Sequence, residues 1–253
     1  LAWALARSVE AHQGQLFFAD RFSKIEADPA GWVVSSRRGT IRARTVVANM
    51  LPQDLARLSG VNSRRLSKLA KRVEAGWGAT MLYLAVEPQV CGHAPHHIEL
   101  VGDELKPFVD GNHVFCSISG IDEARAPDDS RTITCSTHVS ATKIRGMNDA
   151  QKATFIAGVQ ESMRQTIRAR APELLDGSRL EMPGSPRTFE RFTLRSEGLV
   201  GGIPRRAGLA NYGDLFPSAV ARGLYMVGDS VFPGQSTLAT SIGGVKLAQH
   251  LLG

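Results

Sequence analysis

The fold of this chain is decided by the stretch Gly223-Leu-Tyr-Met-Val-Gly-Asp-Ser-Val-Phe-Pro-Gly-Gln-Ser-Thr237, close to its C-terminus. Leu224–Val227 is a short apolar run bounded by glycines, which predicts a buried strand. Gly228-Asp229 follows at the carboxyl end of that strand, where α/β sheets place their ligands. Pro233-Gly234 predicts a tight turn, and the residues from Ser236 to Leu252 predict a helix. The stretch therefore indicates an α/β protein with a ligand site between strand and helix.

The chemistry of this turn suits a ligand with sugar-like hydroxyls and a negative charge. Asp229 only accepts hydrogen bonds when it is ionised, so its partners would be hydroxyl groups such as those of a ribityl chain. The start of the following helix presents free backbone N–H groups and the positive end of the helix dipole, which suits the negative charge of a reduced flavin. An ordinary strand–turn–helix unit in which Ser236 caps the helix fits the same residues. The residue types alone leave both interpretations open.

The composition is that of a globular protein. The chain has 253 residues, of which 43% are hydrophobic and 21% charged, enough for one large domain or two small ones. Its net charge of +6 suits an ordinary solvated surface or contact with an anionic membrane. Aromatic residues make up only 6%, which disfavours a nucleic-acid site built on stacked bases. No run is long and apolar enough to cross a bilayer, so we expect a protein that touches a membrane at most peripherally.

The cysteines and histidines do not form a metal-binding pattern. Cys91, Cys116 and Cys135 are widely spaced and form no C-x-x-C pair, which favours reduced thiols and a cytoplasmic location. Cys91 shares a loop with the histidines of residues 93–97, but a second ligand cluster at matching spacing is lacking. We therefore expect no metal site.

The first 60 residues alternate between short elements. Leu1–Ala11 places apolar side chains four residues apart and predicts an amphipathic helix. Short apolar runs then predict four strands, Gln15–Phe18, Phe22–Ala27, Trp32–Ser36 and Thr45–Asn49. A helix that begins near Pro52 closes this unit.

The middle of the chain has a different pattern. Four runs predict an antiparallel sheet, namely Thr80–Val86, His96–Val101, His113–Ser119 and Thr132–Val139. A long helix, Asn148 to Ala169, and a strand, Arg179–Met182, follow it. We therefore expect residues 61–189 to form a sheet-and-helix substrate domain, inserted between the two parts of an α/β domain at residues 1–60 and 190–253.

A basic amphipathic helix is predicted from Asn62 to Val73. Leu66, Leu69 and Val73 form its apolar stripe, and arginine and lysine residues form the opposite face. Such a helix can lie on anionic lipid, or it can be a surface helix that packs on the protein's own core. The sequence leaves both alternatives open.

Several segments together resemble one protein family. Val227-Gly-Asp-Ser-Val-Phe-Pro-Gly-Gln-Ser236 resembles the C-terminal flavin-binding signature of the flavin amine-oxidase superfamily, specifically its phytoene desaturase and carotenoid isomerase branch. Phe22–Ile25 resembles the family's strand that meets the adenine of FAD, and Val46–Asn49 resembles its return strand beside the flavin. Gly184–Thr193 and Gly198–Pro204 resemble the segment that runs back toward the flavin ring. The similarity spans nearly the whole chain.

The resemblance implies an FAD-binding fold of the amine-oxidase and glutathione-reductase type with an inserted substrate domain. It also implies FAD as the cofactor. Asp229 would hold the ribityl chain, Phe22 would contact the adenine through its backbone, and Gly234–Thr237 would line the isoalloxazine. The full set of cofactor-binding residues implied in this way is Phe22, Asn49, Gly228, Asp229, Gly234, Gln235, Ser236 and Thr237.

The same resemblance implies the reaction. The intact enzyme would remove two hydrogens from an acyclic carotenoid, a lipophilic substrate, and pass a hydride equivalent to flavin N5. The sequence offers no clear general base, so we name no catalytic residue. A carotenoid cis–trans isomerase that uses reduced flavin is one alternative. A flavin amine oxidase is less favoured, because such enzymes usually have aromatic rings beside the flavin and only Tyr212 and Tyr225 are tyrosines late in this chain.

One part of the family pattern does not occur in this sequence. The family begins with a G-x-G-x-x-G turn that holds the pyrophosphate of the cofactor at a helix N-terminus, and no such motif is present. Gln13-Gly14 also stands where the family usually has paired glycines. We therefore expect this chain to be the C-terminal half of a longer enzyme, with the N-terminal FAD-binding half upstream. A non-catalytic fragment or binding module is the alternative.

Overall fold

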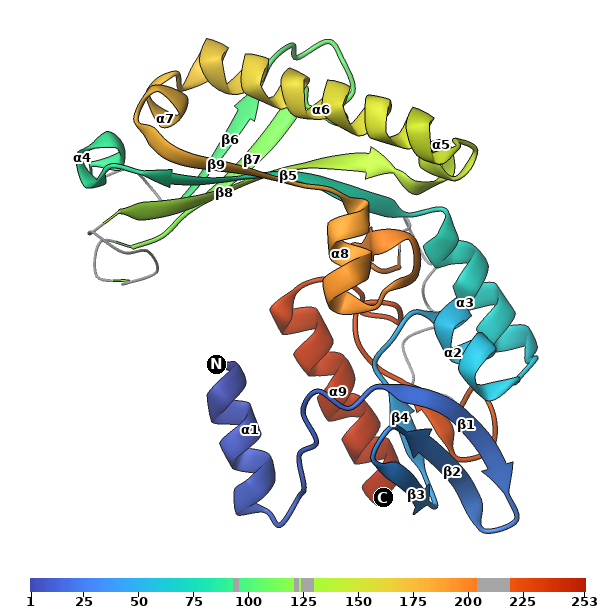
Figure 1. The fold of residues 1–253 in the computed structure, drawn as a ribbon. Coiled ribbons are helices and arrows are strands. Elements are labelled where there is room, and N and C mark those ends of the chain that lie inside the picture. The colour runs from blue at the N-terminus through green and yellow to red at the C-terminus, as the bar shows by residue number, and fades with distance from the viewer. Residues whose placement is uncertain (93–95, 121–122, 124–129, 204–218) are drawn as a thin grey trace.

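The computed structural model describes residues 1–92, 96–120, 123, 130–203 and 219–253. Its helices and strands form two lobes, with α8 (Pro186–Thr193) between them (Figure 1). Both ends of the chain lie in the lower lobe, and the central residues form the upper lobe (Figure 1). His93, Pro204 and Tyr212, which entered the sequence interpretation, lie outside the described residues.

The upper lobe is an antiparallel sheet that a long helix covers on one face. Its described strands pair in the order β10–β5–β8–β7–β6, and β9 also pairs with β5. They are β5 (Trp77–Val86), β6 (His97–Val101), β7 (His113–Ile118), β8 (Arg131–Ser140), β9 (Ser178–Gly184) and β10 (Leu199–Val200). The helices are α4 (Pro88–Cys91), α5 (Ala141–Arg145), α6 (Asp149–Arg170) and α7 (Glu173–Asp176). The predicted sheet and long helix are confirmed.

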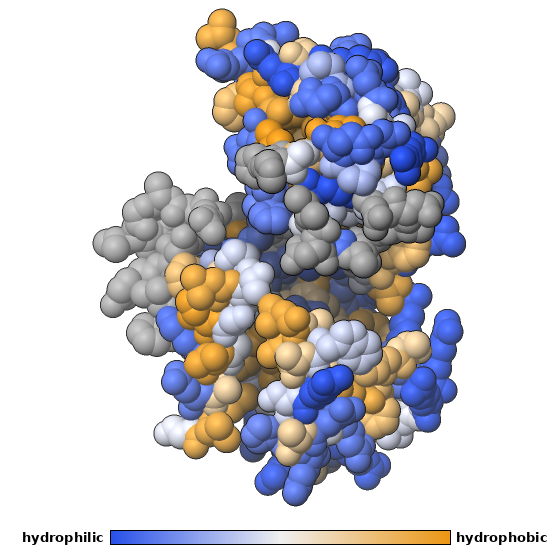
Figure 2. All heavy atoms as spheres, turned by 90° about the vertical axis from the view of Figure 1, so that its left-hand side faces the viewer, coloured by the Kyte–Doolittle hydropathy of each residue, from blue (hydrophilic) through white to orange (hydrophobic). Residues whose placement is uncertain are grey.

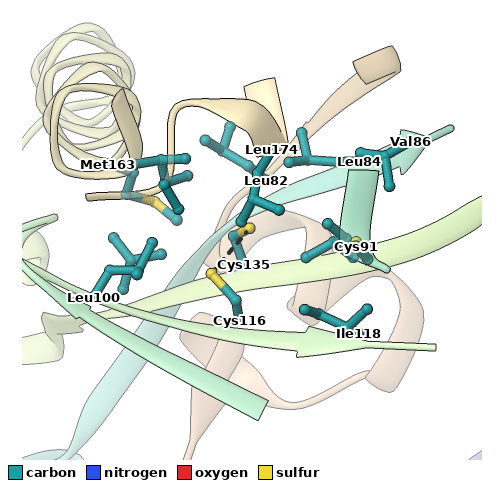
Figure 3. Packing of buried hydrophobic residues seen from close by; sticks show 14 residues of the cluster. Leu82, Leu84, Val86, Cys91, Leu100, Cys116, Ile118, Cys135, Met163 and Leu174 are labelled. Atoms are coloured by element: carbon teal, nitrogen blue, oxygen red, sulfur yellow. Dashed lines mark hydrogen bonds between the residues drawn. The ribbon is translucent and has the colours of Figure 1, made fainter. Parts of the chain in front are cut away.

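The core of the upper lobe lies between this sheet and α6 (Figure 3). Residues of β7 alternate between half-buried and buried, because successive side chains of a strand point to opposite faces. The buried set includes Leu82, which is 0% exposed, and it packs with Met163 and Ile167 of α6. Asn148 caps α6 in a reciprocal pair of hydrogen bonds with Gln151, which fixes where the helix begins.

Two cysteines lie opposite each other inside this core. Cys116 of β7 pairs with Cys135 of β8 in the strand register, and their sulfur atoms are 3.5 Å apart (Figure 3). Both are buried free thiols. The hydrogen bond from Cys116 and the burial of the site raise the pKa of Cys135 far above that of an ordinary thiol. Cys135 is therefore a packing residue in its protonated form.

The lower lobe combines a small antiparallel sheet with a parallel strand pair. β1 (Phe22–Asp28), β2 (Gly31–Ser36) and β3 (Gly39–Ala43) form the antiparallel sheet. β4 (Val46–Ala48) pairs in parallel with β11 (Leu224–Met226), the strand predicted from the deciding stretch. The helices of this lobe are α1 (Ala2–Ala11), α2 (Pro52–Ser59), α3 (Arg64–Glu74) and α9 (Thr237–Leu252).

Two details of the lower lobe differ from the sequence expectation. The strand predicted at Gln15–Phe18 is wrong: these residues form no strand, because they lie at the surface without pairing to any described strand. β3 was not predicted, because its residues are mostly exposed and show no apolar alternation. It forms because the full length of β2 offers a ladder of hydrogen-bonding partners, from Trp32 opposite Ala43 to Ser36 opposite Gly39.

The basic helix α3 packs on the protein's own core. Leu66 and Leu69 are at most 4% exposed and join the lower-lobe cluster that contains Leu55 and Leu224. The apolar stripe of this helix is therefore not available to lipid, and the surface-helix interpretation is confirmed for that face. Within the described residues, no helix is both long and apolar enough to pass through a membrane.

Candidate functional site

The parallel pairing of β4 with β11 brings together two segments that are distant in the sequence. Val46 lies opposite Leu224 and Ala48 opposite Met226, so the carboxyl ends of both strands meet at one edge. Asn49 follows β4, and Gly228 follows Val227 at the end of β11. The two are in close contact, since a Cβ atom added to Gly228 would lie 2.1 Å from Asn49 Oδ1. This edge is where ligands bind in open α/β sheets.

The loop from β11 to α9 has the backbone of a tight, glycine-dependent turn. Gly228 and Gly234 both have φ of +95°, a conformation that residues with a Cβ atom rarely adopt. Ser236, with φ of +124°, caps α9 by accepting a hydrogen bond from the backbone N–H of Ala239 at 3.1 Å. The predicted turn and helix start are thus confirmed, and Thr237 is the first helical residue.

A third segment, which follows β10, closes against this loop. The backbone N–H of Ile203 donates to the carbonyl oxygen of Asp229 at 2.9 Å. A Cβ atom on Gly202 would lie 2.1 Å from that same oxygen, so only glycine allows the two backbones to approach so closely. Gly201 faces the side chain of Gln235, at 3.3 Å from a Cβ atom placed on it. The segment expected to run back toward the cofactor therefore does reach the turn.

The carboxylate of Asp229 has a partner that the sequence did not reveal. Nη1 of Arg195 donates to Asp229 Oδ1 at 3.1 Å, and Nη2 lies 3.0 Å from Oδ2. Arg195 precedes η1 (Ser196–Gly198), in the connection between α8 and β10. No local motif marks this arginine, because its role comes from a contact across 34 positions of sequence. Both side chains are about one-fifth exposed, at 21% and 22%.

The residues at this turn fit the ribityl and ring parts of a flavin. An ionised carboxylate has about four acceptor sites, of which Arg195 Nη1 occupies one on Oδ1 of Asp229, while Nη2 lies beside Oδ2 as an ion-pair contact. Ser230 Oγ donates to Oδ1 at 3.3 Å, which leaves a site on Oδ2 for a ligand hydroxyl. The N-terminus of α9 provides backbone donors for an electron-rich ring edge. The glycines of the loop allow a ligand to approach the backbone closely.

Most, but not all, of the predicted cofactor residues lie together. Asn49, Gly228 and Asp229 lie at the carboxyl ends of β4 and β11, and Gly234, Gln235, Ser236 and Thr237 follow in the same loop. Phe22 lies elsewhere, at the start of β1 in the antiparallel sheet, and its contact with the adenine stays a prediction. Within the described parts of the chain, no group of three or more metal-ligating side chains forms a site.

The face of the upper sheet that is turned away from α6 carries exposed apolar and aromatic side chains. Leu180 and Met182 of β9 are 59% and 55% exposed. The rings of Phe115 and His97 stack with their centres 5.4 Å apart. On the same face, burial lowers the pKa of His138 below its ordinary value, and the nearby His113 adds to the effect. We call this surface the open sheet face; it is turned toward the lower lobe (Figure 1).

Comparison with curated proteins finds relatives of one kind. Prolycopene isomerase of Arabidopsis thaliana, a chloroplastic protein, is 30% identical over 161 residues, which are 62% of this chain and 27% of that protein. Prolycopene isomerase 1 of an Oncidium hybrid cultivar is 39% identical over 80 residues, or 32% of this chain and 14% of that protein. The chain thus spans about a quarter or less of the length of these relatives. No family model matches the sequence.

Solved structures show the same fold over almost the whole chain. An oxidoreductase from Methanosarcina mazei superposes with a TM-score of 0.60 at 15% identity, over 97% of this chain and 52% of that one. Cyclohexylamine oxidase from Brevibacterium oxydans superposes with a TM-score of 0.59 at 16% identity, over 98% of this chain and 50% of that one.

These findings confirm the resemblance that the sequence indicated, and with it the α/β fold. The relatives share a name from carotenoid chemistry, and the solved structures share the architecture. The chain is therefore similar to the prolycopene isomerases over part of their length, and its fold is that of the solved oxidoreductase and amine oxidase.

Proposed function

We propose that this chain is the C-terminal half of an FAD-dependent enzyme that acts on the conjugated chain of an acyclic carotenoid. One observation carries the proposal: the carboxyl ends of β4 and β11 meet at a glycine-rich turn that presents Asp229 beside the start of α9. An acceptor-only carboxylate next to free helix donors matches the hydroxyl and electron-rich groups of a flavin nucleotide.

Each part of the turn has a proposed task toward the cofactor. The free lone pair on Asp229 Oδ2 accepts a hydrogen bond from a ribityl hydroxyl. Residues 234–237 lie along the ring, and the positive end of the α9 dipole stabilises negative charge near it. When bound, FAD supplies the two-electron redox chemistry, while the protein provides orientation and a dry environment. We assign no general acid or base to the chain.

The open sheet face is the proposed surface for the carotenoid. A polyene is long, flat and apolar, and this face offers exposed Leu180 and Met182 beside the stacked rings of His97 and Phe115. Residues 61–189, which contain most of this sheet, would then be the substrate domain, and residues 1–60 and 190–253 the two parts of the cofactor domain. The polyene would lie between this face and the turn that holds the flavin.

The lower lobe has surfaces that suit an upstream half. β4 and β11 pair only with each other among the described strands, whereas parallel sheets normally have more strands and helices on both faces. α1 buries none of its residues, and Leu238 and Val245 of α9 are 71% and 58% exposed. Figure 2 shows hydrophobic side chains gathered on this lobe. A nucleotide-binding unit added to the sheet would cover them, consistent with solved structures about twice as long.

The reaction is tested with the extended protein, meaning this chain together with the coding sequence upstream of Leu1. Incubated with FAD and an acyclic cis-carotenoid, it is expected to give a product with a shifted absorption spectrum. A loss of two hydrogens per new double bond in mass spectrometry identifies desaturation. An unchanged mass identifies isomerisation, which the names of the relatives favour. Failure to bind FAD, or an unaltered carotenoid with bound FAD, would reject the proposal.

Peripheral membrane contact is a separate proposal, because a carotenoid substrate dissolves in lipid. The exposed face of α3 carries Arg64, Lys68 and Lys71, and each basic residue near an anionic surface contributes about 1 kcal/mol to binding. The double variant Lys68→Glu and Lys71→Glu is therefore expected to lower sedimentation with phosphatidylserine vesicles at least tenfold. In the matched control, Arg37 and Arg42 are both replaced by glutamate; these arginines are exposed on the β2–β3 hairpin. An equal loss in both variants, or none in either, would show that α3 is not the contact.

A further inference from the structure

The guanidinium of Arg195 is held in place by two hydrogen bonds and one ion-pair contact. Besides the two contacts with the carboxylate of Asp229, its Nε donates to the carbonyl oxygen of Leu199 at 2.7 Å. The planar fork of an arginine matches the two oxygens of a carboxylate, which adds geometric definition that a lysine cannot supply. The orientation of the Asp229 carboxylate is therefore set by Arg195, in a direction that the Leu199 carbonyl fixes.

The backbone next to Arg195 is anchored from another part of the lobe. The backbone N–H of Ser196 donates to Asp54 Oδ2 at 3.2 Å, and its hydroxyl donates to Asp54 Oδ1. Asp54 lies in α2 and is only 5% exposed. This buried carboxylate joins positions that are 142 residues apart in the sequence. The anchor holds the start of η1, and with it Arg195, against the lower lobe.

The chain on both sides of Arg195 has a conformation that needs such support. Leu194 has φ of +59° and Glu197 has φ of +61°, both in the left-handed region. For residues other than glycine this region costs roughly 1–2 kcal/mol each, and such residues gather at sites where the surrounding structure holds them for a function. Two left-handed residues within four positions bend the connection so that Arg195 faces the turn.

We propose that Arg195 is a positioning residue for the cofactor, which acts through Asp229. The hydrogen bonds from Arg195 Nη1 and Ser230 Oγ occupy two acceptor sites on Oδ1, and Nη2 lies against Oδ2 as an ion-pair contact, which leaves Oδ2 to accept a hydrogen bond from the ligand. A carboxylate that rotates freely would lose orientation entropy on binding, and Arg195 removes this cost in advance. The proposal rests on the proposed FAD site and adds a residue that the family resemblance did not indicate.

The test is a double-mutant cycle on FAD affinity in the extended protein, read by quenching of FAD fluorescence. Arg195→Gln is expected to weaken FAD binding about tenfold, the size of one charge-assisted hydrogen bond, and Arg195→Lys about threefold because it keeps the charge without the fork. In the Asp229→Asn background, Arg195→Gln is expected to change the affinity less than about twofold, because contacting residues that act as one unit are not additive.

Controls separate this role from a structural one. Arg191→Gln removes an exposed arginine from α8, four residues earlier, and is expected to leave FAD affinity unchanged. Thermal unfolding of the FAD-free variants shows whether each remains folded. If Arg195→Gln is unfolded, the FAD affinity of Arg195→Lys tests the proposal in its place. Wild-type affinity in Arg195→Gln, or equal weakening in both backgrounds, would overturn the proposal. Absence of FAD binding by the wild-type protein would instead reject the proposed function itself.

Discussion

Replacing Asp229 with alanine is expected to weaken FAD binding to the extended protein by about 1.5–3 kcal/mol, which corresponds to roughly a tenfold to hundredfold loss of affinity. The variant loses the acceptor for the ribityl hydroxyl and also leaves the guanidinium of Arg195 without its carboxylate partner. Both effects act on the same turn. Purified protein should therefore lose its yellow colour on gel filtration, where the wild-type protein retains it.

The control for this prediction is Asp176→Ala. Asp176 is an exposed aspartate at the end of α7 in the upper lobe, so its removal changes the net charge equally without touching the turn. It is expected to retain FAD as the wild-type protein does. Asp229→Asn is an informative third variant, because it keeps the shape of the side chain and removes the charge. Full FAD retention by folded Asp229→Ala protein would remove this residue from the site.

Replacing Leu82 with alanine is expected to lower the free energy of unfolding of the upper lobe by about 2–5 kcal/mol. Leu82 is 0% exposed and lies in β5, at the centre of the cluster between the sheet and α6. Leu82 lies between Cys135 of β8 and Pro183 of β9 in the strand register and packs against α6, so its removal is expected to leave a cavity that closes only in part. Urea unfolding of the chain, followed by circular dichroism, measures the change as a lower midpoint.

The matched control is Leu180→Ala on the neighbouring strand β9. Leu180 belongs to the same sheet but is 59% exposed on the open sheet face, so the same substitution leaves no cavity. Its effect on unfolding is expected to be within about 0.5 kcal/mol. Equal destabilisation by both variants would mean that the open sheet face is covered in solution. A negligible effect of Leu82→Ala would contradict the described core.

The local elements were largely predictable because each depends on a short stretch of residues. The strand, turn and helix from Leu224 onward follow from an apolar run, two glycines at positive φ and a capping serine. The alternation in β7 and β8 and the cap of α6 at Asn148 are equally local. Where the pattern was weak, prediction failed: the surface run Gln15–Phe18 is no strand, and the exposed strand β3 had no apolar signal.

By itself, then, the sequence determined the order of strands and helices, the glycine-rich turn and the family to which these segments are similar. Only the tertiary structure decided that Asn49 meets Gly228, that α3 packs its apolar stripe inward, and that Arg195 holds Asp229. Contacts between positions 34 or 142 residues apart depend on how whole helices and strands pack. The same local sequence pattern is compatible with many such packings, so it does not predict these contacts. For that reason, the contact of Arg195 with the Asp229 carboxylate could not be predicted from the sequence and was found only in the tertiary structure.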